Sequence, residues 1–527
     1  MGSIDSLDSL GVKLPSITLD DTLAELYKRA SPKNANQRLG MVFCGVNSGV
    51  DLSADFPRNT KFLYQDTPFN TMRRNELIHQ KNDDLRKSLA MKYLCLTAQR
   101  DSFIAGKAPV ILFHQDARSA EQREHDAREA QMTMALIEES QRPDLIFCAG
   151  PTQIPVKEYG IEKLAYKLAI DGLENYTLTH DPETHWFLNS KGGLAQSGLP
   201  TPRSKIIQVE GYNVSPEECC DVCKTSKGAA RFIPLGCKGS RNKWLSEQTQ
   251  HILESIKQHP IPFVLKNQQV FGGAGTWVIT NEEQKKELLA QLTGGDDGQD
   301  SDSGILRKLL SLVTSRNAHL SPGNIIMSDL VADIIGDYGL TFVVTDTGEA
   351  VFLAASEQMI SDSNAWIGSN IDYTSQDELQ AKFSDLIGRV AKWVAGHGVY
   401  GPIGVDVLET RTAGETASNT GEDTKYHIVD LNVRPSGSFS LPLLRKFFTS
   451  RGLNFASSFS VTVKGDRTEF IRNWKDEFES GRMLILSWYH DRESNESIAD
   501  VVVAAEDGEG LQREMKRVRD ATEEVTF

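Results

Sequence analysis

The sequence predicts a mixed α/β and α+β protein that is built from several packed units. The first observation is its length of 527 residues, which exceeds that of one ordinary domain. The second is an alternation of short apolar runs with long polar stretches over residues 37–185, and the third is a change to hairpin-like strand pairs after residue 186. An apolar content of 39% with 24% charged residues supplies enough side chains for a core.

The N-terminal part has the pattern of an α/β domain. Residues 1–36 form a lead-in with one predicted helix, Thr22 to Ala30. Three short apolar runs then predict strands: Leu39 to Val46, Val110 to Phe113 and Leu145 to Cys148. The polar stretch between the second and third runs, Ala117 to Gln141, predicts a helix. Strands that alternate with helices favour a largely parallel sheet, so residues 37–185 are predicted to form a nucleotide-fold-like domain.

The remainder divides into a long central part, residues 186–460, and a small C-terminal α+β unit, residues 461–527. The C-terminal unit is predicted from two apolar runs and a charged helix, Met483 to Trp488, Ala499 to Ala504 and Gly510 to Ala521. Two polar, low-complexity stretches in the central part cannot bury apolar area and are predicted to be surface loops, Thr293 to Gly304 and Arg411 to Thr424.

Charge and hydropathy exclude some partners. The net charge is −15, from 57 basic and 72 acidic residues, and such a surface repels phosphate backbones, so no nucleic-acid partner is expected. No apolar run approaches the roughly 20 residues that span a bilayer, so no membrane partner is expected. Seven scattered cysteines are typical of reduced thiols in the cytoplasm.

A first motif with chemical meaning runs from Pro262 to Ile279. An apolar strand leads to Lys266, and a glycine-rich turn with Gly272, Gly273 and Gly275 precedes a second strand. Small glycines let backbone N–H groups approach phosphate oxygens, and a lysine neutralises their charge. The order differs from a Walker motif, because the lysine precedes the glycines. A plain β-turn explains the same residues equally well.

A second motif comprises Gly401 to Thr410 and Tyr426 to Ser438. Asp430, Asn432 and Arg434 recur at every second position among apolar residues, which places them on one face of a strand. Asp406 lies in the neighbouring apolar strand. Two carboxylates and an amide oxygen suit Mg²⁺, and Arg434 would then face a phosphoryl group. The alternative is a solvent-exposed strand face.

A third motif, Asn189 to Pro202, has Lys191 at the start of a short helix and Gly198-Leu199-Pro200 before a new strand. Alone it is an ordinary helix-turn-strand join. In this order the three motifs resemble the ATP-grasp superfamily over residues 186–460, with residues 37–185 as the domain that usually precedes the grasp and residues 461–527 as a small appendage.

The resemblance implies a role for each matching residue. Lys191 and Lys266 would contact ATP phosphates, and the glycine-rich flap Phe271 to Gly275 (including Gly272, Gly273 and Ala274) would close over them. Asp406, Asp430 and Asn432 would bind one or two Mg²⁺ ions, with Mn²⁺ as a substitute, and Arg434 and Lys266 would act in catalysis. The adenine hinge maps to Ser328, Asp329 and Leu330. The chain departs from the family pattern at Ser190, Asn267 and Asp430, where Asp, Pro and Glu are more common.

The implied activity is a ligase that forms an amide or peptide bond from ATP, a carboxylate and an amine through an acyl phosphate, releasing ADP and phosphate. The layout also resembles stand-alone amino-acid or peptide ligases of microbial secondary metabolism. A carboxylate–thiol ligase or a small-molecule kinase would share every residue above, and a nucleotide-binding protein without turnover is a further alternative. A homodimer is compatible with the resemblance.

Four cysteines within 20 residues raise the question of a zinc site. Cys220 and Cys223 form one CxxC pair, and Cys219 and Cys237 lie nearby, but Cys237 has no adjacent partner and the next histidine is His251. A structural zinc site takes four ligands, usually at regular spacing. The sequence therefore favours a polar inserted loop over residues 212–242.

Overall fold

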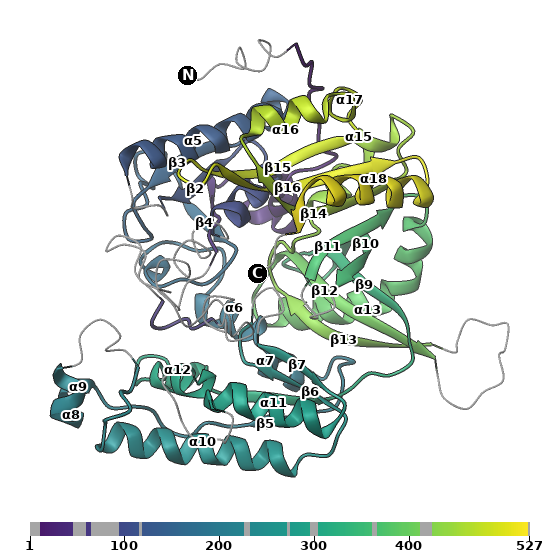
Figure 1. Ribbon diagram of the computed structural model, residues 1–527. Coiled ribbons are helices and arrows are strands. Elements are labelled where there is room, and N and C mark those ends of the chain that lie inside the picture. Colours follow the sequence, from purple (N-terminus) through teal and green to yellow (C-terminus); the bar gives the residue numbers. More distant parts are fainter. Residues whose placement is uncertain are drawn as a thin grey trace.

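The computed structural model describes residues 11–45, 59–64, 94–114, 119–225, 232–270, 275–295, 304–360, 366–411 and 424–524. Within these ranges the chain forms a four-stranded parallel sheet, a nine-stranded antiparallel sheet and a four-stranded antiparallel sheet (Figure 1). The mixed α/β and α+β class predicted from the sequence is confirmed. No helix in this part of the chain is both long enough and apolar enough to cross a membrane.

The parallel sheet belongs to the N-terminal part and has the strand order β3-β2-β1-β4. Three of its strands fall on predicted apolar runs: β1 (Leu39–Val42), β2 (Pro109–Phe113) and β3 (Asp144–Cys148). The strand β4 (Lys163–Tyr166) was not predicted, and the helix α5 (Ala120–Ala135) is shorter than the predicted Ala117 to Gln141. The lead-in helix α2 (Leu23–Ala30) begins at Thr22, whose side chain accepts from the Glu25 amide in a capping box.

The smaller antiparallel sheet has the order β5-β8-β6-β7 and forms a lobe with three helices (Figure 1). Its strands are β5 (Ser204–Ile207), β6 (Phe263–Asn267), β7 (Thr276–Ile279) and β8 (Ile325–Asp329), and its helices are α10 (Ser240–Gln258), α11 (Glu282–Thr293) and α12 (Ile305–Ser311). One apolar core joins them, with Leu265 and Met327 from the strands and Ile252, Leu288 and Leu309 from the helices. We call this unit the small lobe.

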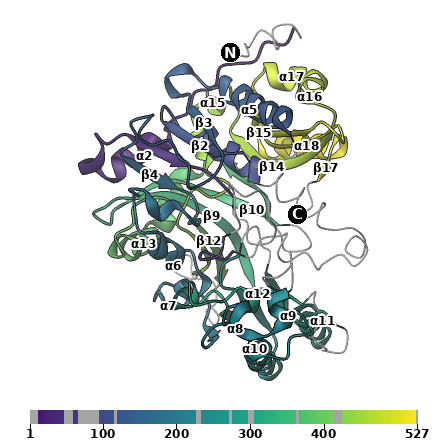
Figure 2. The same cartoon turned by 90° about the vertical axis from the view of Figure 1, so that its left-hand side faces the viewer.

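The nine-stranded sheet has the order β13-β12-β9-β10-β11-β14-β16-β15, with β17 (Glu523–Glu524) paired to β14. Its first half comprises β9 (Ile334–Val344), β10 (Ala350–Ile360), β11 (Trp366–Asp372), β12 (Gly401–Arg411) and β13 (Thr424–Asn432), covered by α13 (Gln376–Gly396). Two short helices, α6 (Pro182–Leu188) and α7 (Lys191–Gln196), precede β5 in the chain. They lie between the parallel sheet and the small lobe (Figures 1 and 2).

The C-terminal strands continue the large sheet. The strand β14 (Phe455–Lys464) runs through residue 460, and β15 (Met483–Asp491) and β16 (Glu496–Ala505) follow it in the same sheet. The helices of this part are α14 (Ser440–Leu443), α15 (Arg445–Thr449), α16 (Arg467–Asn473), α17 (Lys475–Glu479) and α18 (Gly508–Ala521). The side chain of Gln99, from the N-terminal part, bonds both the N–H and the C=O of Trp488 at 3.0 and 2.9 Å. The C-terminal strands therefore pack directly against the N-terminal domain.

Candidate active site

Two lysines from different elements converge on adjacent residues of β13. Lys266, at the end of β6 in the small lobe, donates from Nζ to the Val429 carbonyl at 2.7 Å. Lys191, the first residue of α7, forms an ion pair through Nζ with Asp430 Oδ1. The glycine-rich hairpin and the helix-turn-strand motif are thus brought to the strand that carries the second motif.

Local packing holds Lys191 in this place. Its backbone N–H donates to the Gln268 carbonyl at 2.9 Å, and the next N–H, of Gly192, donates to the Gln268 side chain at 2.9 Å. A Cβ at Gly192 would lie 2.8 Å from Gln268 Oε1, which is closer than real Cβ atoms approach. The glycine therefore lets the helix start sit directly on the residues that follow Lys266.

The two acids face each other across the β12–β13 pair. Asp406 of β12 is in register with Asp430 of β13, and a β-bulge follows Asp406. Directly opposed residues point to the same face of a sheet, and like charges in that position repel. Lys191 pairs with Asp430, and the Gln358 side-chain amide donates to Asp406 Oδ1 at 2.8 Å. The pair is therefore held by a cation and an amide donor.

The surrounding charges shift the pKa values of the two acids in opposite directions. Burial raises the pKa of Asp406, and the negative charges of the nearby Asp430 and Asp337 raise it further. Burial would also raise the pKa of Asp430, but Lys191 and Lys266 outweigh it and hold that pKa below its usual value. Burial and the Lys191 charge lower the pKa of Lys266 to about 8, against the opposing effect of the two acids. Opposite shifts in neighbouring groups are typical of functional sites.

Arg434 lies two residues beyond the end of β13. Its Nη1 donates to Asn189 Oδ1, and the same oxygen accepts the Val433 N–H at 2.9 Å. The Asn189 amide in turn donates to the His185 carbonyl at 2.7 Å. Asn432 is the last residue of β13, in register with Gly404 of β12. Asp430, Asn432 and Arg434 are each half-buried, while Leu431 and Val433 are buried, so the predicted alternation is present.

The predicted flap falls mostly on residues that the structure leaves undescribed. Gly272, Gly273 and Ala274 lie outside the described residues, as does Phe271. Gly275 is described and has a φ of +76°, a conformation that favours glycine. Its carbonyl accepts the Asn267 N–H at 2.9 Å, which closes the hairpin next to Lys266.

The predicted adenine hinge lies where the chain leaves the small lobe. Ser328 is buried at the end of β8 and its hydroxyl bonds that of Ser204 at 2.9 Å. Asp329 is exposed and pairs with Arg203 at 3.1 Å, and Leu330 is half-buried. These residues precede β9, so they sit on the connection between the two antiparallel sheets.

The oxygen atoms at the β12–β13 pair fit a magnesium ion. Two opposed carboxylates and the Asn432 amide are hard ligands, and two lysines beside them supply the charge that a polyphosphate requires. Asp337 of β9 adds a third carboxyl on the same face, with a pKa that burial raises to about 6. Asp406, Asp430, Lys191 and Lys266 therefore lie together, and Asn432 follows Asp430 by two residues on β13; their roles with ATP and Mg²⁺ stay predictions.

Sequence reasoning missed a group of residues beside this site. The Trp366 indole donates to Gln358 Oε1 at 2.6 Å, which links it to Asp406, and the Arg100 guanidinium lies 5.9 Å from the Trp366 ring centroid. Lys167 is buried and pairs with Asp101 at 2.6 Å. Burial lowers the pKa of Lys167 to about 8, against the effect of Asp101, and the positive charges of Arg100 and Arg434 lower it further. No motif marked these positions, because they come from three separate segments.

Two histidines beside this site are core residues. Burial lowers the pKa of His180 to about 4 and that of His185 well below its usual value. His185 Nε2 lies 2.9 Å from the Val433 carbonyl, so this side chain supports the segment that carries Arg434.

Among solved structures, the chain is similar to an N5-carboxyaminoimidazole ribonucleotide synthetase in complex with ADP, with 11% identity, a TM-score of 0.46 and 97% of each chain covered. It is also similar to the Staphylococcus aureus N5-carboxyaminoimidazole synthetase with ADP, at 11% identity and a TM-score of 0.44, over 96% of this chain and 98% of that chain. For the phosphoribosylamine–glycine ligase of Thermotoga maritima the identity is 12% and the TM-score 0.43, over 81% and 96%. No protein-family model and no curated sequence matches the chain.

Proposed function

We propose that this protein is an ATP-dependent carboxylate–amine ligase of the ATP-grasp type. The observation that carries the proposal is the convergence of Lys191 and Lys266 on β13, beside the opposed carboxylates of Asp406 and Asp430. Two directly opposed acids repel each other, and burying two lysine charges beside them costs desolvation free energy, so such a group would destabilise a strand pair that served only the fold. They suit the phosphates of a nucleotide and the metal ion that accompanies them.

ATP would bind between the small lobe and the large sheet. The adenine would lie at the connection formed by Ser328, Asp329 and Leu330, and the phosphates would extend to Lys266 and Lys191. Lys266 is fixed at a strand end and Lys191 at a helix start, so both ammonium groups are held before ATP arrives. Such preorganised charges need little rearrangement when negative charge develops.

Mg²⁺ would be held by Asp406, Asp430 and Asn432. When bound, the ion supplies charge neutralisation between the β- and γ-phosphates. Lys191 pairs with Asp430, so its ammonium already lies beside a carboxylate that would hold the ion. Gln358 orients Asp406 by donating to one oxygen, which leaves the other oxygen for the ion.

Arg434 would act on the transferred phosphoryl group. Its guanidinium is held by Asn189 at the junction of α6 and α7 and lies next to the end of β13. A carboxylate oxygen of the substrate would attack the γ-phosphorus in line, forming an acyl phosphate and ADP. Arg434 would stabilise the charge that spreads over the equatorial oxygens. An amine would then attack the acyl carbon and displace phosphate, losing a proton as the amide forms.

The carboxylate substrate would lie on the side of Arg434 that faces the N-terminal domain. Arg100 and Lys167 lie close to Arg434, because burial lowers the pKa of Lys167 and the charges of Arg100 and Arg434 lower it further. Lys167 pairs with Asp101 and Arg100 with Asp500. Trp366 joins this group to Asp406 through Gln358. A small anion with an apolar or aromatic portion fits such surroundings, and we propose amino-acid-like substrates.

The proposal is tested by incubating the protein with ATP, Mg²⁺ and amino acids, singly and in pairs, while phosphate release and product masses are measured. We expect phosphate release with a product whose mass is that of two substrates minus water. The Asp430→Asn variant should lose this activity, and Asp372→Asn, which changes a carboxylate on β11 that bonds its own turn, should keep it. A phosphorylated substrate as the final product would instead assign a kinase, and a thioester product a carboxylate–thiol ligase.

A further inference from the structure

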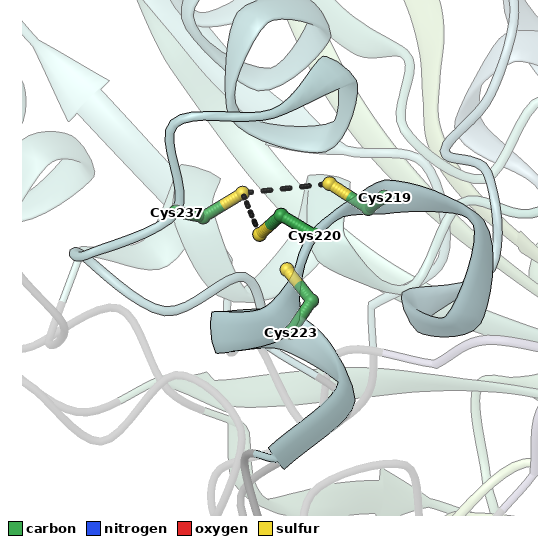
Figure 3. A group of neighbouring side chains, drawn as sticks. All are labelled: Cys219, Cys220, Cys223 and Cys237. Carbon is green, nitrogen blue, oxygen red and sulfur yellow. Dashed lines mark hydrogen bonds between the residues drawn. The ribbon is translucent and has the colours of Figure 1, made fainter.

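The four clustered cysteines come together at one point of the small lobe. Cys219 ends the short helix α8 (Pro216–Cys219), Cys223 lies in α9 (Asp221–Thr225), and Cys237 lies on the segment that returns to α10. Figure 3 shows the side chains of Cys219, Cys220, Cys223 and Cys237 turned toward a common centre. Their sulfur atoms all lie within 4.8 Å of one another.

The distances fit four ligands around one ion. The Sγ of Cys237 lies 3.6 Å from that of Cys219 and 3.8 Å from that of Cys220. A disulfide requires about 2.05 Å, and these four cysteines carry free thiols. A tetrahedral ion with Zn–S bonds of about 2.3 Å places its sulfur ligands about 3.8 Å apart. The cluster therefore has the size of a four-thiolate zinc site.

Cys219 lies beside Cys237 in the cluster, and the backbone conformation at residues 219 and 220 explains how two neighbouring cysteines both reach it. The helix α8 ends at Cys219, and Cys220 has the extended angles φ −162° and ψ 166°. This change of conformation between neighbours lets both side chains point inward. A Cβ at Gly239 would lie 2.6 Å from Cys219 Sγ, so the small residue leaves room for the sulfur. Cys237 has no adjacent cysteine in the sequence, but the fold brings Cys219 to it, and residues 216–219 and 221–225 are helical where a polar loop was predicted.

The insert also needs an internal link to hold its shape. The helices α8 and α9 have four and five residues, far fewer than the roughly 12 that an isolated helix needs in water. Cys223 and Cys237 are 1% and 2% exposed and belong to the core of the small lobe. The cluster thus joins the insert to the lobe at the point where the chain enters α10.

The surroundings favour negative charge. The 19-residue helix α10 begins at Ser240, three residues after Cys237, so its N-terminal amides lie close along the chain to the cluster. The start of the helix adjoins the cluster, because a Cβ at Gly239, the residue before Ser240, would lie 2.6 Å from Cys219 Sγ. Thiolates are stabilised by helix N-termini.

We propose that Cys219, Cys220, Cys223 and Cys237 bind a structural Zn²⁺ ion that fixes residues 212–225 and 232–242 to the small lobe. Binding forms four Zn–S bonds, and the thiol protons pass to solvent. Four protein ligands leave no open position, so the ion has no part in the chemistry proposed at Lys266 and Asp430.

The metal content of the purified protein tests this directly. Elemental analysis after purification without chelators should give about one zinc per chain. Cys220→Ser should lose that zinc, Cys220→His should retain it because imidazole is also a zinc ligand, and Cys148→Ser should retain it as the matched cysteine control outside the cluster. Zinc that persists in Cys220→Ser, or a parent protein without zinc that also fails to take up added Zn²⁺, would overturn the proposal.

A second measurement needs no substitution in the cluster. The parent protein, stripped with a chelator and titrated with Co²⁺, should develop thiolate-to-cobalt charge-transfer absorption and tetrahedral d–d bands that saturate at about one equivalent. Asp430→Asn should give the same spectrum, because its defect lies in the proposed ATP site. Absence of these bands would show that the cluster is not a metal site. So would disulfides in the freshly purified protein, which intact-mass spectrometry would detect as the loss of two hydrogens for each disulfide.

Discussion

Lys266→Met tests how the small lobe contributes to ATP binding. The substitution removes a half-buried ammonium whose Nζ donates to the Val429 carbonyl at 2.7 Å, beside Asp430 and Asp406. Methionine keeps most of the length and the apolar stem of lysine, so no large cavity forms. The variant should remain folded, since it removes the cost of burying the ammonium although the Val429 carbonyl loses its donor.

The expected effect on ATP follows from one lost charge-assisted contact. Hydrogen bonds to charged groups contribute about 1.5–3 kcal/mol, which corresponds to a roughly 10- to 150-fold loss of affinity. The lower end applies if Lys191 takes over part of the neutralisation, because its ammonium lies on the neighbouring Asp430. The upper end applies if the two lysines contact different phosphates.

Isothermal titration calorimetry with ATP and Mg²⁺ measures this affinity. Lys285→Met is the matched control: Lys285 is a buried lysine of the same lobe whose Nζ donates to the carbonyls of Lys257 and His259, each at 2.9 Å. It should bind ATP like the parent. If Lys266→Met also bound ATP with the affinity of the parent, the assignment of Lys266 to the phosphates would be refuted.

Three further predictions concern the same site. Asp430→Asn removes one anionic ligand and should lower kcat by about 100-fold or more with a smaller effect on ATP affinity, as measured by phosphate release and calorimetry. ATP affinity should fall as the pH rises through the pKa of Lys266, about 8, because the ammonium loses its proton. Lys266→Arg stays charged and should not show this fall when the affinity is measured by calorimetry across pH. Asn189→Ala removes the acceptor shared by Val433 and Arg434, and should lower kcat while the ATP dissociation constant stays near that of the parent and the free energy of unfolding falls by about 1–3 kcal/mol. An Asn189→Ala enzyme with the parental kcat would show that Arg434 does not depend on this contact.

Much of the fold could be predicted because local patterns were strong. The apolar runs at Val110 to Phe113 and Leu145 to Cys148 became β2 and β3, and the charged helix Gly510 to Ala521 became α18 with a shift of two residues at its start. The C-terminal strands were predicted as strands, but the pairing of β16 with β14 and of β15 with β16 depends on contacts that period-two alternation does not specify.

The candidate site was predictable in its residue types and less so in its contacts. Alternation placed Asp430, Asn432 and Arg434 on one face, but the strand ends at Asn432 and the partner of Arg434, Asn189, lies 245 residues away in sequence. The β-bulge after Asp406 likewise depends on the pairing with β13. Gln358, Trp366 and Lys167 come from segments without a motif, so only their proximity in space marks them.

The central claim is that the γ-phosphoryl group of ATP is transferred to a carboxylate, which an amine then attacks. Once an accepted substrate pair is known, its carboxylate is labelled with ¹⁸O, and the nucleotide and phosphate products of turnover are separated and weighed by mass spectrometry. We predict ADP, with one labelled oxygen from the carboxylate in the released inorganic phosphate. AMP with pyrophosphate as the stoichiometric products, or phosphate without label, would contradict the account.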